Sequence, residues 1–276
     1  MYGFDLTDQD LNKLTFRIKE LCDVDYSNFA KSAFRISLSS FMQSHAIYSI
    51  DELVFRLAKE PLLAEFMIKD LAVEDSEAFR DTLVWKIIRF DIIKELYEKR
   101  EEKLRIWVPG CTTGDELYSL CILLKENFFM DKVELMASSI SEKYIEQIKI
   151  GLFSIKKCEI NQANYLRYKG KADFKTYYTV SGNKAHWDTS LIEHVKFLPA
   201  RTLFKAPPEN IQFIFFRNRM LYYNYHLQLQ ILNTFHKCLS NDGFLILGAK
   251  ETLSNFNMKA KFSIVNENES VYKKIS

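Results

Sequence analysis

The spacing of apolar residues changes near residue 103, and this change limits the possible folds more than any other feature of the sequence. Before it, apolar residues recur every three or four positions, which is the period of a helix face. After it, helical stretches separate short apolar runs, which are LRIWV, VELMA, HVKFL, IQFIFF and FLILG. Because strands that alternate with helices are typical of a parallel sheet, we predict an α/β domain with a mainly parallel sheet.

The same pattern predicts how the sheet is built. The strands at 104–108 and 133–138 are expected to be neighbours. The final run, FSIVNENESVYKKI, contains two apolar segments around a polar turn, and we expect it to close the sheet as an antiparallel pair. Helices are expected between the strands, at 115–127, 141–150 and 224–240.

Two domains are predicted. Residues 1–73 show helical patterns only and are expected to form an all-helical domain. Residues 74–276 are expected to form the α/β domain. Within it, residues 160–190 are rich in Tyr, Lys and Gly and fit neither period, so we expect a small inserted subdomain of turns and short strands there.

Start signals precede two of the N-terminal helices. The pairs Thr7–Asp10 and Ser49–Glu52 have the spacing of a capping box, although Asp10 replaces the usual Glu or Gln. Further helical patterns run over about 27–45, over LLAEFMIKDL behind Pro61, and over about 76–102.

Composition narrows the possible functions. A net charge of +2 gives no general affinity for nucleic acid or for an anionic membrane. The five cysteines show no CxxC spacing, so we expect neither a disulfide framework nor a metal site. No apolar run approaches the ~20 residues of a membrane span, and the N-terminus MYGFDLTDQD lacks the apolar core of a signal peptide. We therefore expect a cytoplasmic protein without membrane insertion or nucleic-acid binding, and we also expect a monomer.

The stretch RIWVPGCTTGDELYSL (105–120) predicts a ligand-binding corner. It combines a strand, a turn at Pro109–Gly110 and a helix that starts near Gly114. Such a corner usually presents backbone N–H groups to a phosphate. Here Asp115 and Glu116 stand where a phosphate would need a lysine, and neither of the common phosphate-binding glycine patterns is present. The ligand must accept negative charge beside it, unless the two carboxylates only stabilise the helix N-terminus.

Five segments in order, behind the helical N-terminal part, resemble the chemotaxis-receptor methyltransferases of the CheR type. The segments are SEAFRD, WVPGCTTGDELYSL, ASSISEKYIEQIKIGLFS, IQFIFFRNRMLYY and GFLILGAKETL. Enzymes of this family transfer a methyl group from S-adenosylmethionine to glutamate side chains of chemoreceptors and release S-adenosylhomocysteine. The resemblance implies a Rossmann-like methyltransferase sheet, S-adenosylmethionine as cofactor, and the cytoplasmic region of a chemoreceptor or related signalling protein as partner. The cofactor carries cationic groups and hydroxyls, which suit carboxylates.

The resemblance also implies site residues. Arg80 and Tyr222 are expected to be catalytic by orienting the acceptor carboxylate and the sulfonium, because a glutamate with a pKa of ~4.3 is already ionised and needs no general base. Lys31 and Arg35 match the basic helix that faces the acidic substrate region. Each role has a simpler alternative. Arg80 could be a surface arginine, and Tyr222 could be a core aromatic residue. Lys31 and Arg35 could be two solvated cations. The residues expected to bind the cofactor are Ser76, Arg80, Gly110, Gly114, Glu116, Ser139, Arg201, Thr202, Arg217 and Asn218.

This chain departs from the family pattern on the cofactor side. Where the family holds the ribose hydroxyls with an aspartate, this chain has Ser139, and the lost charge would weaken binding by about 1–3 kcal/mol, or roughly 5–150-fold. Arg201 replaces an expected Asn, Arg219 and Lys250 replace smaller residues, and Ser76 alone keeps the hydroxyl of the first segment. Three hypotheses remain: a protein-glutamate methyltransferase, a non-catalytic relative that serves as a partner-binding module in signalling, and a methyltransferase with another acceptor.

Overall fold

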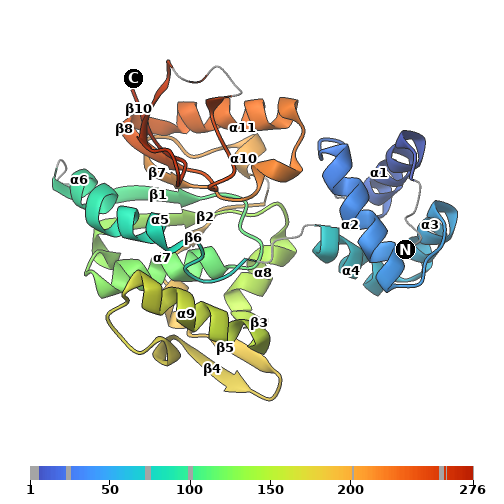
Figure 1. Cartoon of the computed structure of the whole chain (residues 1–276), viewed down its shortest axis with the longest axis horizontal. Coiled ribbons are helices and arrows are strands. Elements are labelled where there is room, and N and C mark those ends of the chain that lie inside the picture. Colours follow the sequence, from blue (N-terminus) through green and yellow to red (C-terminus); the bar gives the residue numbers. More distant parts are fainter. Residues whose placement is uncertain are drawn as a thin grey trace. The chain divides into compact units, whose positions relative to one another are not determined.

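The computed structural model describes residues 6–22, 26–71, 76–98, 102–200, 202–254, 258 and 260–275. The chain divides into two compact units (Figure 1). The helical unit comprises Met1–Val73 and Met220–Gln230, and the sheet unit comprises Glu74–Arg219 and Ile231–Ser276.

The helical unit is built around one apolar core. Its helices are α1 (Asp8–Cys22), α2 (Lys31–Ser44), α3 (Ile50–Lys59) and α4 (Pro61–Leu71). Each helix contributes at least one side chain that is completely buried in this core, namely Leu14, Leu38, Leu53 and Met67. The apolar positions at helical spacing therefore face inwards, as an amphipathic helix requires.

Both predicted capping pairs are confirmed. The Asp10 amide donates to Thr7 Oγ1 at 3.2 Å, and the Thr7 amide donates to the Asp10 carboxylate at 2.9 Å. The Glu52 amide donates to Ser49 Oγ at 3.1 Å, and the Tyr48 amide donates to the Glu52 carboxylate at 2.9 Å. These bonds satisfy amide groups that a helix N-terminus otherwise leaves without a partner.

A short segment distant in sequence completes the helical unit and corrects one prediction. The backbone around Phe29 pairs with Tyr223, and the Ala30 amide donates to the Tyr222 carbonyl at 2.8 Å. The second helix therefore begins at Lys31 and not near residue 27, because the preceding backbone is engaged in this pairing. This contact places Tyr222 in the helical unit.

The sheet unit contains a seven-stranded sheet with the strand order β6-β2-β1-β7-β8-β10-β9. Its class, the pairing of the first two strands and the antiparallel end are confirmed. The predicted strand HVKFL is shorter than expected, since only two of its residues pair. The parallel strands are β1 (Leu104–Val108), β2 (Val133–Ala137), β6 (Lys196–Phe197), β7 (Ile211–Phe215) and β8 (Leu239–Ile246), and the antiparallel ones are β9 (Phe262–Asn266) and β10 (Val271–Lys274).

Helices cover both faces of this sheet (Figure 1). On one face, Trp107 of β1 packs edge-on against Phe235 of α11 (Tyr225–Cys238), with ring centroids 5.9 Å apart. On the other face, Trp85 of α5 (Thr82–Ile87) lies 5.0 Å from Phe215 of β7. The remaining helices of the main fold are α6 (Ile93–Glu98), α7 (Asp115–Glu126), α8 (Glu142–Ile150) and α10 (Thr202–Lys205), and single 3-10 turns lie at Met130–Lys132, Ile155–Lys157, Phe174–Tyr177, Thr189–Ile192 and Met220–Tyr222.

The long helix predicted over 76–102 is only partly correct. Residues 76–81 form a loop, α5 begins at Thr82, and a π-helical turn at Ile88–Ile92 separates α5 from α6. In the loop, Phe79 and Asp81 have positive φ angles of 52° and 54°. A helix does not accommodate these angles, so Arg80 precedes the helix and does not lie on it.

The insertion contains more helix than the sequence predicted. Its three-stranded antiparallel sheet has the order β3-β5-β4, and helix α9 (Cys158–Tyr168) lies between the first two strands in sequence. This helix was missed because much of its buried face is polar or aromatic, including Asn161, Asn164 and Tyr165. The strands of the insertion are β3 (Leu152–Ser154), β4 (Tyr178–Ser181) and β5 (Lys184–Trp187).

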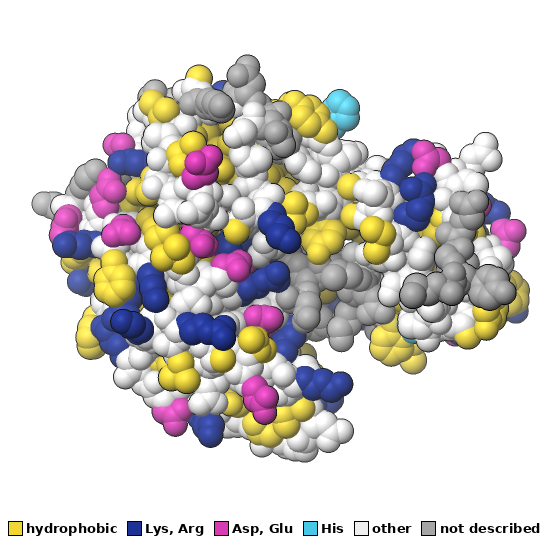
Figure 2. All heavy atoms as spheres, viewed as in Figure 1, with side chains coloured by type: hydrophobic (Ala, Val, Ile, Leu, Met, Phe, Trp, Pro, Cys, Tyr) yellow, Lys and Arg dark blue, Asp and Glu magenta, His cyan; other side chains and the backbone are white. Residues whose placement is uncertain are grey.

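The surface shows no large area of one charge on the face drawn in Figure 2, where basic and acidic side chains are interspersed. Within the described ranges, none of the helices combines the length and the apolar character needed to cross a membrane.

Candidate active site

The turn between β1 and α7, residues 109–114, contains Gly110 and Gly114 and is the glycine corner of this fold. It lies at the carboxyl end of β1, which is the sheet edge where ligands of α/β proteins usually bind. The Cys111 amide donates to the Ser138 carbonyl at 2.8 Å, and the Ser138 amide donates to the Val108 carbonyl at 3.1 Å. The Ser139 hydroxyl donates to the Cys111 carbonyl. The corner loop is therefore tied to the end of β2. Because this bond uses the only proton of the Ser139 hydroxyl, that group serves the loop in this structure.

Gly110 and Gly114 are required by the backbone at this corner. Their φ angles are +70° and +83°, which residues with a Cβ rarely adopt. A Cβ on Gly110 would lie 3.1 Å from Cδ of Arg219, and one on Gly114 would lie 3.2 Å from Cγ2 of Ile148. The two glycines thus form the turn and admit close packing of side chains against it.

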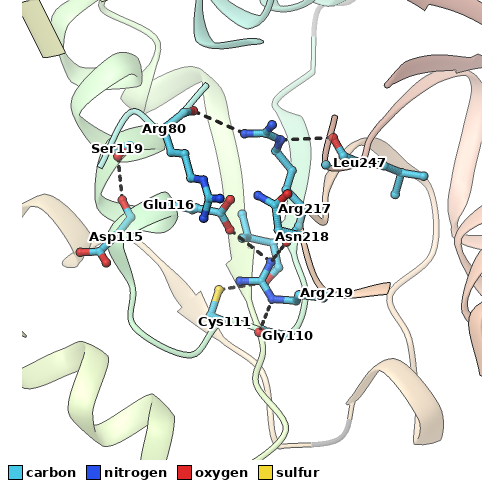
Figure 3. A network of polar contacts seen from close by, with 12 residues as sticks. Arg80, Gly110, Cys111, Asp115, Glu116, Ser119, Arg217, Asn218, Arg219 and Leu247 are labelled. Atoms are coloured by element: carbon cyan, nitrogen blue, oxygen red, sulfur yellow. Dashed lines mark hydrogen bonds and ion pairs between the residues drawn. The ribbon is translucent and has the colours of Figure 1, made fainter. Parts of the chain in front are cut away.

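Arg219 lies across the glycine corner (Figure 3). Its Nε donates to the Gly110 carbonyl at 2.7 Å, and its Nη1 lies 3.2 Å from Oε2 of Glu116. The same Nη1 donates to the Arg217 carbonyl at 3.1 Å. The side chains of Arg219 and Glu116 are only 6% and 8% exposed. Arg219 therefore joins the segment that follows β7 to the turn through the Gly110 carbonyl and to the first turn of α7 through the buried ion pair.

Asp115 has a different environment from its neighbour Glu116. Its side chain is 1% exposed, and Lys157 Nζ lies 3.4 Å from Oδ2. Burial raises the pKa of the Asp115 carboxyl to about 6, and the positive charge of Lys157 opposes that rise. Lys157 also donates to the Ser76 carbonyl at 2.5 Å. The inserted subdomain thereby reaches both the glycine corner and the loop before α5.

The loop at 76–81 is held from three sides. The Ala78 amide donates to Asn161 Oδ1 at 2.9 Å, and the Phe79 amide donates to the Ser119 hydroxyl at 3.0 Å. The Arg80 carbonyl accepts from Trp85 Nε1 at 2.8 Å. Left-handed backbone in non-glycine residues is strained and needs such support. The loop holds Arg80 so that its exposed side chain points towards Glu116 (Figure 3).

Arg217 and Asn218 build the next corner, after β7. Arg217 is completely buried and donates to the Leu247 carbonyl at 3.2 Å, to the Arg80 carbonyl at 3.4 Å and to Asp81 at 2.8 Å. The Asn218 amide donates to the buried Glu251 carboxylate at 2.9 Å. In this structure the two residues therefore fasten the loop around Arg80 and the corner after β7.

The other predicted site residues lie in several places. Thr202 is buried at the start of α10, where its hydroxyl donates to the Pro199 carbonyl at 2.5 Å. Arg201 lies outside the described residues. In the helical unit, Lys31 and Arg35 lie 2.7 and 2.9 Å from the carboxylate of Asp8, so an acidic partner would compete with Asp8 for them.

Sequence reasoning missed two partners of this site. In the sequence, Arg219 stands out only as a departure from the family pattern, and Lys157 belongs to no motif. The Arg219–Glu116 contact joins residues 103 positions apart, so no local spacing indicates it. Among the residues that the structure describes, no group of His, Cys, Asp or Glu side chains is arranged to hold a metal ion.

Comparison with known proteins identifies relatives that align with most of the chain. A family model described as "CheR methyltransferase, SAM binding domain" matches residues 74–271. A protein of Pseudomonas putida with the provisional name methyltransferase Cher3 is 25% identical over 268 residues, which cover 97% of each chain. The chemotaxis protein methyltransferase of Borreliella burgdorferi is 23% identical and covers 91% of this chain and 90% of its own. Chemotaxis protein methyltransferase 1 of Pseudomonas aeruginosa is 26% identical, with 79% and 81% covered.

Solved structures of methyltransferases also align with the chain. The N-methyltransferase NodS of Bradyrhizobium japonicum, in complex with S-adenosylhomocysteine, is 10% identical with a TM-score of 0.40 and covers 73% of this chain and 90% of its own. The DszA carbon methyltransferase is 14% identical with a TM-score of 0.41 and covers 86% of this chain and 51% of its own.

Proposed function

The chain belongs to the CheR methyltransferase family, and we propose that it transfers the methyl group of S-adenosylmethionine to a glutamate side chain of a chemoreceptor or a related signalling protein. Membership makes it a chemotaxis-type methyltransferase with S-adenosylmethionine as cofactor. The observation that carries the proposal is the corner at the end of β1, where Gly110, Gly114 and Glu116 meet the loop that presents Arg80.

The residues of this corner fit the cofactor. The Glu116 carboxylate suits a cationic group, and the glycine turn lets the backbone approach a ligand closely. The N-terminus of α7 adds amide groups that suit a carboxylate. Glu116 is already paired with Arg219, so a cationic group of the cofactor would have to displace Arg219 from this carboxylate. When bound, S-adenosylmethionine supplies a methyl group activated by positive sulfur, and its transfer to an ionised carboxylate requires no proton movement.

The chain's own contribution would be orientation and exclusion of water. Arg80 offers a planar set of donors that can hold a carboxylate in a fixed direction. Its backbone is fixed by Trp85 and Arg217, which limits the positions that the guanidinium can take. Tyr222 would contribute a directional hydroxyl. Holding the reacting atoms in line in this way can supply several kcal/mol, on the order of 7–11 for ideal geometry.

Methyl transfer can be tested directly. The protein is incubated with radiolabelled S-adenosylmethionine and the cytoplasmic fragment of a chemoreceptor from the same organism. We expect label in the fragment that alkali releases as methanol, because methyl esters hydrolyse whereas N-methyl groups do not. A fragment in which the acceptor glutamates are replaced by alanine is the matched control. Label that alkali does not release, or equal label in the control fragment, would contradict a glutamate acceptor.

A second function is favoured by one observation. Because Arg219 pairs with Glu116 inside the corner, the chain could instead be a non-catalytic relative that binds its partner without transferring a methyl group. In that case the receptor fragment would bind the protein, while no label would be transferred at any cofactor concentration. Binding with transfer excludes this alternative.

A further inference from the structure

We propose that Arg219 is a built-in competitor for the cofactor: its guanidinium occupies the position beside Glu116 that a cationic ligand group would take, so that a ligand with an ammonium binds only when Arg219 releases Glu116. The inference rests on the placement of the cofactor at the glycine corner. It concerns cofactor affinity and not the identity of the methyl acceptor.

The contacts of Arg219 support this role. The guanidinium contacts three separate parts of the corner: the Gly110 carbonyl at 2.7 Å, the Glu116 carboxylate at 3.2 Å and the Arg217 carbonyl at 3.1 Å. The Arg219 side chain also packs against the turn, since Cδ lies 3.1 Å from the position of a Cβ on Gly110. It thus fills the approach to the backbone that the glycine turn would otherwise leave open.

The burial of the ion pair makes Arg219 a strong competitor of a ligand ammonium for Glu116. The two side chains are 6% and 8% exposed, so water can replace neither partner of the ion pair at low cost. A ligand ammonium can take over Glu116, but the displaced guanidinium must then find new partners or reach solvent. The ammonium should therefore add little to affinity in the unmodified protein, although a charged hydrogen bond is otherwise worth about 10- to 150-fold.

The affinities of two ligands distinguish competition by Arg219 from a purely structural role of Arg219 in the corner. S-Adenosylhomocysteine carries an ammonium and a carboxylate at its amino-acid end, whereas its deaminated analogue, 4-(5′-adenosylthio)butyrate, keeps the adenosine, the thioether and the carboxylate but lacks the ammonium. Calorimetric titration of the unmodified protein with both should give dissociation constants within about tenfold of each other. If S-adenosylhomocysteine binds more than about 100-fold tighter, Glu116 already serves the ammonium and the proposal is overturned.

Substitution of Arg219 gives the second test. Arg219→Gln keeps a donor for the Gly110 carbonyl but removes the charge, and it should tighten S-adenosylhomocysteine binding by about tenfold or more. Binding of the deaminated analogue should stay within about twofold. Arg219→Lys keeps the charge and should retain the unmodified affinity for both ligands. Arg105→Gln breaks another ion pair, with Glu134 at 3.0 Å, and should change neither affinity.

The outcomes are distinct from those of the methyl-transfer assay. Unchanged S-adenosylhomocysteine binding in Arg219→Gln, weaker binding of both ligands, or no binding of either ligand by any variant would overturn the proposal. If Arg219→Gln does not fold, as judged by its thermal transition, the ratio of the two ligands in the unmodified protein decides. Tighter binding without any methyl transfer would support the role of Arg219 and contradict the proposed enzyme activity.

Discussion

Replacement of Asp115 by asparagine is expected to stabilise the sheet unit at neutral pH, and the gain should depend on pH. The side chain is 1% exposed, and Oδ1 has no hydrogen-bond partner among the described residues. Lys157 lies 3.4 Å from the other carboxylate oxygen. Burial nevertheless outweighs this positive charge and raises the pKa of Asp115 from 3.8 to about 6. An asparagine has nearly the same shape but carries no charge to bury.

The sign and size follow from proton binding in the two states. Below pH 3.8 the carboxyl is protonated whether the protein is folded or unfolded. As the pH rises towards 6, the unfolded chain loses the proton while the folded protein keeps it, so the free energy of unfolding falls. The destabilisation is about 2 kcal/mol at pH 5 and approaches ~3 kcal/mol at pH 7.5.

Urea unfolding followed by tryptophan fluorescence can measure this difference. All three tryptophans, Trp85, Trp107 and Trp187, lie in the sheet unit, so the signal reports on that unit. The advantage of Asp115→Asn over the unmodified protein should widen by about 1 kcal/mol between pH 5 and pH 7.5. Asp131→Asn changes an exposed aspartate and should show no such widening. If the advantage of Asp115→Asn stays constant or shrinks as the pH rises, the buried-charge argument is wrong.

Three further substitutions test other parts of the structure. Tyr222→Phe should lower turnover far more than S-adenosylhomocysteine affinity, because its hydroxyl is assigned to geometry; a rate equal to that of the unmodified protein would refute the assignment. Gly110→Ala should cost about 1–2 kcal/mol and weaken cofactor binding, since φ is +70° and the new Cβ would lie 3.1 Å from Arg219; urea unfolding and titration measure both effects. Ser49→Ala should lower the stability of the helical unit by about 1 kcal/mol through loss of the cap on α3, with slower amide exchange in α3 as the result that contradicts it.

Local features of the sequence were enough for the regular parts of the fold. The capping pairs at Thr7 and Ser49 lie where they were predicted, because a cap depends on residues only three positions apart. The strands of the main sheet were predicted because strands buried on both faces need continuous apolar runs. The turn at Gly110 was predicted because few other residues accept its backbone angle.

Features with a mixed local signal were predicted less well. Helix α9 was missed because Asn161 and Asn164 are buried, where the periodicity of an amphipathic helix would place apolar residues. Asn161 accepts from the Ala78 amide and Asn164 donates to the Ala78 carbonyl, so their burial serves the loop before α5. The helix predicted over 76–102 was too long at its start, because residues 76–81 form this loop. Within the loop, Phe79 adopts a left-handed backbone angle that its side-chain type does not suggest.

The sequence by itself therefore determined the strands of the main sheet, the two capped helix starts and the glycine corner, all of which depend on residues that are close along the chain. Only the tertiary structure decided that Arg219 pairs with Glu116 across 103 positions and that the segment around Tyr222 joins the helical unit through Ala30. Such contacts form when distant segments pack together, and a single arginine or tyrosine leaves no periodic pattern that reveals its partner. The chemistry of the corner depends on such long-range contacts. They leave the Glu116 carboxylate paired with Arg219, and they bury the Asp115 carboxylate without its full set of hydrogen bonds.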